Sequence, residues 1–158
     1  MATMVTFFHF LHVTAALWIT AGVFGSAVVR VAIKRSAGTL EARALGFRIL
    51  WRLHVVYTLP GLLLAGFLGF YLVTAAGYRF GAFWVMASSM LYLAMFLWTV
   101  FLLTPALHRL HGAARSALEA GETTAELDLL AGSKLWGILS DVNALSILVL
   151  VFFMTVKP

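Results

Sequence analysis

The sequence contains no cysteine and very little charge. Its 158 residues include 6 acidic and 11 basic side chains, so 11% are charged, against roughly a quarter in a soluble domain. The missing cysteines exclude disulfides, thiolate-bound iron–sulfur clusters and zinc–thiolate sites. The shortage of charge excludes a soluble protein, because 63% of residues are hydrophobic and the mean hydropathy is +1.00. The composition indicates a single-domain integral membrane protein over residues 1–158.

Long apolar runs take the place of a polar surface. They cover 1–29, 53–78, 80–108 and 135–156, and each exceeds the ~20 residues that cross a bilayer as a helix. Asp141 is the only formal charge inside them. Because backbone polar groups cannot face lipid, we predict an all-α membrane bundle of four helices, with spans at about 5–29, 53–76, 81–107 and 135–156.

The basic residues predict the orientation of the bundle. Nine of the eleven lie on the first and third connections, while Arg79 lies alone on the second and Lys157 near the C-terminus. The positive-inside rule places the first and third connections in the cytoplasm and both termini outside. The cytoplasmic loop at 109–134 is predicted to extend the third helix, break at Gly121 and form a short acidic helix. The +5 net charge therefore reflects topology and does not indicate nucleic-acid binding.

The five histidines are the candidate ligands: His9, His12, His54, His108 and His111. A neutral imidazole binds haem iron, copper or zinc, and a histidine inside a span is by default a functional hypothesis. His12 is the best candidate, because it lies deepest in the first span and shares a helical face with Ile19, Val23 and Arg30. His9 lies on the same face, one turn nearer the surface.

The histidines are predicted to occupy two depths. Across a hydrocarbon core ~30 Å thick, His12 lies near the outer boundary and His54 near the inner one, roughly 15–20 Å apart at 1.5 Å per residue. Two axial ligands of one haem must be nearly level, so we expect two sites. The outer site would use His12 or His9, and the inner one His54 with His108 or His111. His108 and His111 have an alternative interpretation, because histidines in a last helical turn also complement the helix dipole and suit the headgroup layer.

Two charged residues and one stripe of small residues are open to two interpretations each. Asp141 is either half of a structural pair, with His54, Arg52 and Lys134 at comparable depth, or a second-shell or proton-relay partner of a ligand histidine. Arg79 either binds a carboxylate such as a haem propionate or anchors the interface. The second span carries Pro60, which predicts a kink, and a stripe that predicts close approach of a helix or a flat cofactor: His54, Thr58, Gly61, Ala65 and Gly69. Gly22 and Gly25 in the first span suggest the same.

Four stretches resemble a bacterial family of predicted four-helix integral membrane proteins of unknown function: His12 to Arg30 with Trp18 and Gly22, PGLLLAGFLGFYL, LWTVFLLTPALHRL and FFMTVKP. The resemblance covers nearly the whole chain. More distantly, the first helix is similar to that of the copper-resistance protein D and membrane protoporphyrinogen oxidase families. In those families a histidine of this helix is thought to bind copper or haem b, which implies such a role for His12, with His9 as the alternate. The oxidase family also has a lysine at the start of its third helix, where this sequence offers Arg79.

We therefore expect a haem b-binding protein of the bacterial inner membrane that transfers electrons across or within the bilayer. A copper-handling protein is the first alternative, although the six methionines are scattered along the chain and only Met1 and Met4 have MxxM spacing. A non-catalytic accessory or assembly subunit is the second. If the chain is an enzyme, we expect an oxidoreductase or a subunit of one, although no nucleophile–base pair, phosphate loop or zinc-protease motif is present. Expected partners are lipid and either further copies of the chain or a membrane redox complex.

Overall fold

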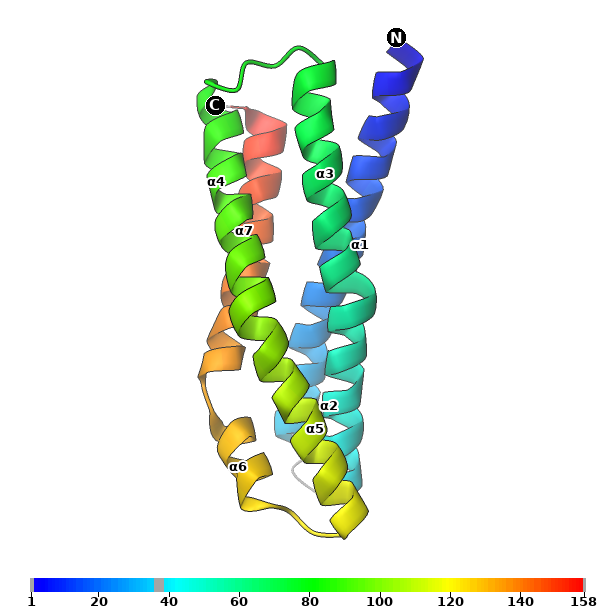
Figure 1. The fold of residues 1–158 in the computed structure, drawn as a ribbon, viewed down its shortest axis with the longest axis vertical. Coiled ribbons are helices and arrows are strands. Elements are labelled where there is room, and N and C mark those ends of the chain that lie inside the picture. Colours follow the sequence, from blue (N-terminus) through cyan, green and yellow to red (C-terminus); the bar gives the residue numbers. More distant parts are fainter. Residues whose placement is uncertain (1, 36–38, 158) are drawn as a thin grey trace.

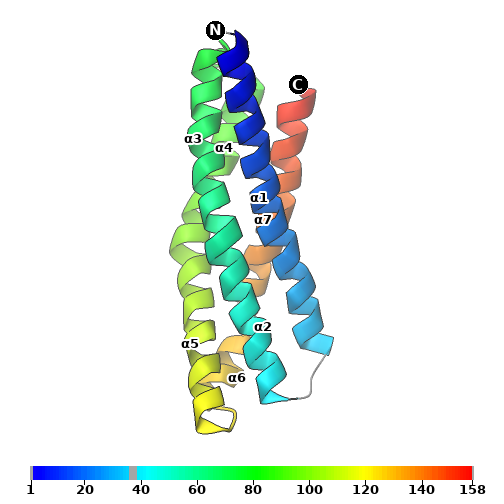
Figure 2. The same cartoon turned by 90° about the vertical axis from the view of Figure 1, so that its right-hand side faces the viewer.

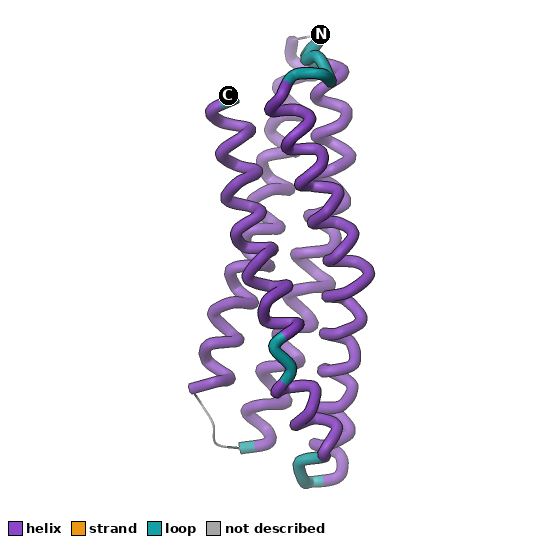
Figure 3. Tube along the Cα trace, turned by 90° about the vertical axis from the view of Figure 1, so that its left-hand side faces the viewer, coloured by secondary structure: helices purple, strands orange, loops and turns teal. Residues whose placement is uncertain are grey.

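The computed structural model describes residues 2–35 and 39–157, and these residues form helices and short connections without any strand (Figures 1 and 3). In chain order the elements are α1 (Ala2–Arg35), α2 (Leu40–Leu53), η1 (His54–Thr58), α3 (Leu59–Ala75), α4 (Phe83–Trp98), η2 (Thr99–Leu103), α5 (Thr104–Ala120), α6 (Ala125–Gly132) and α7 (Leu135–Val156). The η elements are single π-helical segments that join α2 to α3 and α4 to α5 without a break.

The described residues include four helical stretches that are long and apolar enough to cross a membrane: Thr3–Arg35, Leu40–Ala75, Phe83–Ala120 and Ala125–Val156. The predicted all-α membrane bundle is confirmed. Both termini lie at one end of the bundle (Figures 1 and 2). From the charge distribution we call this the outer end and the opposite one, with α6, the inner end.

The helices continue past the predicted spans at the inner end. α2 begins at Leu40, and the hydroxyl of the preceding Thr39 accepts a hydrogen bond from the Ala42 amide. α5 ends at Ala120 and is capped by Gly121, whose φ of +76° is the left-handed conformation that glycine adopts readily. The break predicted at Gly121 is thus confirmed. α2, α5 and α6 share a core of buried apolar residues that includes Phe47, Leu110 and Leu127. This inner core holds together the parts of the helices that carry most of the charge.

In each of the two long helices, α2–η1–α3 and α4–η2–α5, the π segment ends two residues before a proline. Pro60 and Pro105 lack the amide proton that would bond four residues back. The amide of Leu59 bonds to the His54 carbonyl instead, five residues back, and the amide of Thr104 bonds in the same way to Thr99. The carbonyl of Val56, which Pro60 leaves without its helical partner, accepts a hydrogen bond from the Trp18 indole of α1 at 2.8 Å. The kink predicted at Pro60 therefore takes the form of a π turn.

The stripes of small residues allow α1 to pack closely against η1 and α3. A Cβ built on Gly22 would lie 2.8 Å from the Thr58 amide nitrogen, and one built on Gly61 would lie 2.9 Å from the Ile19 amide nitrogen. Such contacts are too close for any side chain, so the two backbones touch there. Of the two interpretations of these stripes, helix–helix contact describes Gly22 and Gly61.

Candidate functional site

A cavity of about 500 Å³ lies in the outer half of the bundle, between α1, α3, α4 and α7. In the upper part of Figure 1 these helices form two pairs, α1 with α3 and α4 with α7, and the pairs stand apart. The lining is mainly apolar. Its polar members come from α1, α4, the connection between α3 and α4, and the residue that follows α7: His9, His12, Tyr78, Trp84, Ser88, Ser89, Tyr92 and Lys157. The volume falls in the range of about 300–1,000 Å³ that small-molecule and cofactor sites occupy.

His12 reaches across from α1 to α3 at the wall of this cavity. Its ring lies against Gly69, where a Cβ would sit 3.1 Å from His12 Cε1. The ring lies near the backbone carbonyl of Ala65, and its Nδ1 is buried and has no hydrogen-bond partner in the described part of the chain. If Nε2 carries the ring proton, Nδ1 keeps its lone pair. A backbone carbonyl that fixes one ring nitrogen and leaves the other free is how proteins orient ligand histidines.

Ser88 and Tyr92 present the polar groups of α4. The Tyr92 hydroxyl donates to the Leu62 carbonyl at 2.8 Å, which links α4 to α3. The Ser88 hydroxyl, one turn nearer the outer end, is buried and has no partner among the described residues. Buried polar groups are nearly always hydrogen-bonded. His12 and Ser88 thus both indicate that the cavity holds something polar, either water or a ligand.

The outer rim of the cavity is cationic and aromatic. Lys157 Nζ donates to the Tyr78 hydroxyl at 2.9 Å and lies 5.4 Å from the centre of the Trp84 ring. Arg79 follows Tyr78 on the exposed connection between α3 and α4, although it does not line the cavity. Among the described residues the lining contains no carboxylate, so the positive charge at this rim would favour an anionic group on a ligand.

His54 lies elsewhere, in a separate polar network near the inner end. Its side chain is 2% exposed, and Nε2 lies 2.8 Å from the Thr104 hydroxyl, which itself donates to the Thr99 carbonyl. Asn143 of α7 continues the network by bonding to Thr99 and to the Trp98 indole. The cavity beside His54 measures about 20 Å³, which holds about one water molecule. The structure therefore places His12 and His54 at different cavities, and only the first has room for a cofactor.

The other inner histidines gather around Trp51 of α2. The centre of its ring lies 6.2 Å from His54, 5.2 Å from His108 and 6.2 Å from His111, and the His111 ring is stacked within 10° of parallel. His108 is exposed, while Nδ1 of His111 is buried and has no partner among the described residues. Within those residues no group of three or more histidine, cysteine, aspartate or glutamate side chains is arranged to hold a metal ion.

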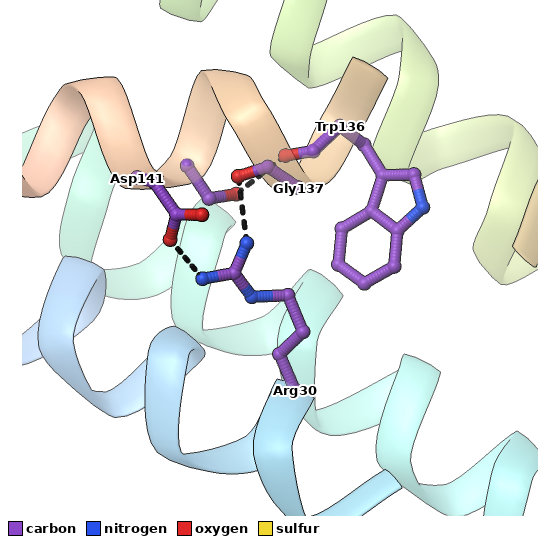
Figure 4. A network of polar contacts seen from close by, with 5 residues as sticks. Arg30, Trp136, Gly137 and Asp141 are labelled. Atoms are coloured by element: carbon purple, nitrogen blue, oxygen red, sulfur yellow. Dashed lines mark hydrogen bonds and ion pairs between the residues drawn. The ribbon is translucent and has the colours of Figure 1, made fainter. Parts of the chain in front are cut away.

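Asp141 pairs with an arginine of α1. Figure 4 shows Arg30 reaching toward α7, where Nη2 contacts the Asp141 carboxylate and Nη1 donates to the Gly137 carbonyl at 2.6 Å. The Trp136 ring lies alongside, 5.9 Å from the guanidinium carbon. Of the two interpretations of Asp141, the Asp–Arg pair is the one with a contact in the structure. Its partner is Arg30 rather than Arg52 or Lys134.

Comparison with models of known protein families identifies the family of this chain. Residues 6–158 match the model of the family described as predicted integral membrane protein (DUF2269). The chain belongs to this family. Its membership agrees with the bundle in identifying a multi-pass integral membrane protein. No curated protein and no solved structure matches the chain.

Several cavity residues were not singled out from the sequence. Ser88 and Ser89 had a signal, because two adjacent hydroxyls interrupt an apolar run. Met95 and Met154 had none: they lie far apart in the sequence on α4 and α7, yet both line the cavity that holds His9 and His12. The fold thus assembles soft sulfur and imidazole groups that no local motif announces.

Proposed function

We propose that this protein binds haem b in the outer cavity, with His12 as a ligand of the iron, and carries electrons in the bacterial inner membrane. The observation that carries the proposal is His12 itself, a partly buried imidazole at the wall of a cavity of about 500 Å³, whose Nδ1 has no hydrogen-bond partner among the described residues. The resemblance seen in the sequence around His12 to families in which a histidine of this helix is thought to bind copper or haem b is consistent with the proposal.

The lining suits both the apolar and the anionic parts of haem. The macrocycle is apolar, and residues such as Ile19, Leu150 and Val151 would surround it. The propionates are anionic, and they would find Lys157 and Tyr78 at the outer rim. When bound, haem b supplies one-electron chemistry at its iron. The residues of this chain hold it, exclude water and set its orientation.

His54 is left out of this site, because its own cavity has room only for about one water molecule. His9 lines the same cavity as His12, one turn nearer the outer end, and it is the alternate ligand. Arg79 stands beside the rim and would add to its positive charge.

A visible absorption spectrum tests the proposal. The protein, expressed with a haem precursor and purified in mild detergent, is expected to show a Soret band that sharpens and shifts on reduction with dithionite. His12→Ala is expected to remove most of this band at equal protein concentration. His108→Ala is the matched control, because that histidine is exposed at the inner end, and its spectrum should equal that of the wild type. No Soret band, or an equal band in both variants, would show the proposal to be wrong.

Copper is the second candidate, and one observation favours it. Met95 and Met154 line the same cavity as the two histidines, and thioether and imidazole ligands together suit Cu(I). Metal analysis of the purified protein separates the candidates: iron in step with the Soret band supports haem, and copper without the band supports the alternative. Met95→Leu should lower the copper content and leave a haem ligated by His12 in place.

A further inference from the structure

A cluster of basic and aromatic residues at the inner end, which we call the basic inner patch, has no part in the proposed function. It consists of Arg48 and Trp51 on α2 and His108, His111 and Arg115 on α5. The hydrogen bond between His54 and Thr104 sets the register of these antiparallel helices. One turn farther in, Trp51 meets both imidazoles, and beyond it Arg48 and Arg115 lie within electrostatic range of His111.

The patch carries more positive than negative charge. Arg115 pairs with Glu119 on its own helix at 2.8 Å. The other ion pairs among the described residues are Arg30 with Asp141 and Arg43 with Asp128. Arg48 has no carboxylate partner in that part of the chain. The buried Nδ1 of His111 also lacks a hydrogen-bond partner there. A guanidinium and an imidazole nitrogen without partners on neighbouring helices are the groups that bind a phosphate.

The patch lies at the level of the lipid headgroups. Beyond Arg52 toward the outer end, the exposed side chains of η1 include the apolar Val55 and Val56. Toward the inner end, charged residues begin with Arg52 and Arg48. Tryptophan is enriched at this boundary, and Trp51 lies there with imidazole rings against it. A phosphate at this depth would leave the lipid chains in contact with the apolar surface above.

We propose that the basic inner patch binds the phosphate of an anionic phospholipid in the cytoplasmic leaflet. Basic pockets between helices on the cytoplasmic side are known to bind anionic headgroups. Arg48 would supply the main charge, His111 a hydrogen bond, and Trp51 a rigid wall that positions the imidazoles. The site is separate from the outer cavity and does not depend on haem.

The test is lipid binding measured by native mass spectrometry on the delipidated protein in detergent. Phosphatidylglycerol is the probe, phosphatidylcholine of the same chains is the neutral comparison, and inorganic phosphate is a competitor. A basic residue near a membrane surface contributes about 1 kcal/mol, so Arg48→Gln should weaken phosphatidylglycerol binding about fivefold. Arg109→Gln is the matched control, because it removes the same charge from an exposed position of α5 that does not act on His111. It should change binding less than about twofold.

Each other outcome overturns the proposal. Equal weakening by both variants would mean general attraction to basic loops rather than a site. Equal binding of phosphatidylcholine would mean that the anionic charge is not recognised. Displacement of phosphatidylglycerol by millimolar phosphate would assign the patch to a free anion instead of a lipid. Arg48 is exposed, so its variant should keep the thermal unfolding midpoint of the wild type, and this measurement shows that any loss of lipid is not a loss of fold.

Discussion

The hydrogen bond from the Trp18 indole to the Val56 carbonyl leads to a testable prediction about η1, the π turn before Pro60. Pro60 leaves the Val56 carbonyl without its helical partner, and the indole of α1 donates to it at 2.8 Å. No water is present in the lipid to replace a lost donor. Trp18→Phe should therefore destabilise the protein by about 1–2 kcal/mol, from the hydrogen bond and from weaker packing on Tyr57, whose ring centre lies 5.5 Å away.

A double-mutant cycle isolates the hydrogen bond from the packing. In Pro60→Ala the new amide is free to bond to Val56, so the indole is no longer needed. Trp18→Phe should then cost about 1 kcal/mol less than in the wild type, within the range of about 0.6–1.7 kcal/mol measured for such pairs in membranes. The packing loss is the same in both backgrounds and cancels.

The assay is reversible unfolding by SDS in mixed micelles, followed by far-UV circular dichroism. Pro105→Ala is the control background, because it alters the other π turn and leaves Val56 unchanged; Trp18→Phe should be additive there within about 0.3–0.5 kcal/mol. If Trp18→Phe costs the same with and without Pro60, the indole does not compensate for the proline and the reasoning fails.

Three further predictions use the same unfolding assay. Gly22→Ala should lower the free energy of unfolding by about 2 kcal/mol or more, because the new Cβ would meet the Thr58 backbone. Gly25→Ala is the control: its Cβ would lie 3.4 Å from a flexible leucine, and it should change stability by less than about 1 kcal/mol. Equal effects of the two variants would refute the backbone contact. Asn143→Leu should cost about 1–3 kcal/mol by leaving the Trp98 indole and Thr99 unsatisfied, and a neutral result would contradict that network. Arg30→Met should destabilise more than Asp141→Asn, because Arg30 loses two partners and strands a carboxylate, while the asparagine variant keeps the bond to Gly137; the reverse order would argue against the pair.

The fold was predictable because lipid imposes a simple rule. Apolar runs long enough to cross a bilayer must be helices when they lie in lipid. The chain has too little charge to keep these runs in water instead. The break at Gly121 was predictable for a similar local reason, since glycine favours the left-handed conformation that ends α5. Features of this kind depend on neighbours in sequence.

The site depended on distances between helices, which the sequence does not specify. The depth argument separated His12 from His54, and the structure places them at different cavities. The outer cavity itself exists because the α4–α7 pair stands away from α1 and α3, and no pattern indicates that gap. Asp141 illustrates the same limit, because its partner Arg30 lies 111 residues away in the sequence.

The two π turns also affect how the length of this chain can change in evolution. A π turn is an α-helix with one extra residue, and each residue turns the helix by about 100°. Deleting one residue within His54–Thr58 or Thr99–Leu103 would convert the turn to ordinary helix and keep the faces on both sides in place. The same deletion elsewhere in a span would rotate one half of the helix away from its neighbours. We therefore expect single-residue length differences among relatives to fall at these two prolines.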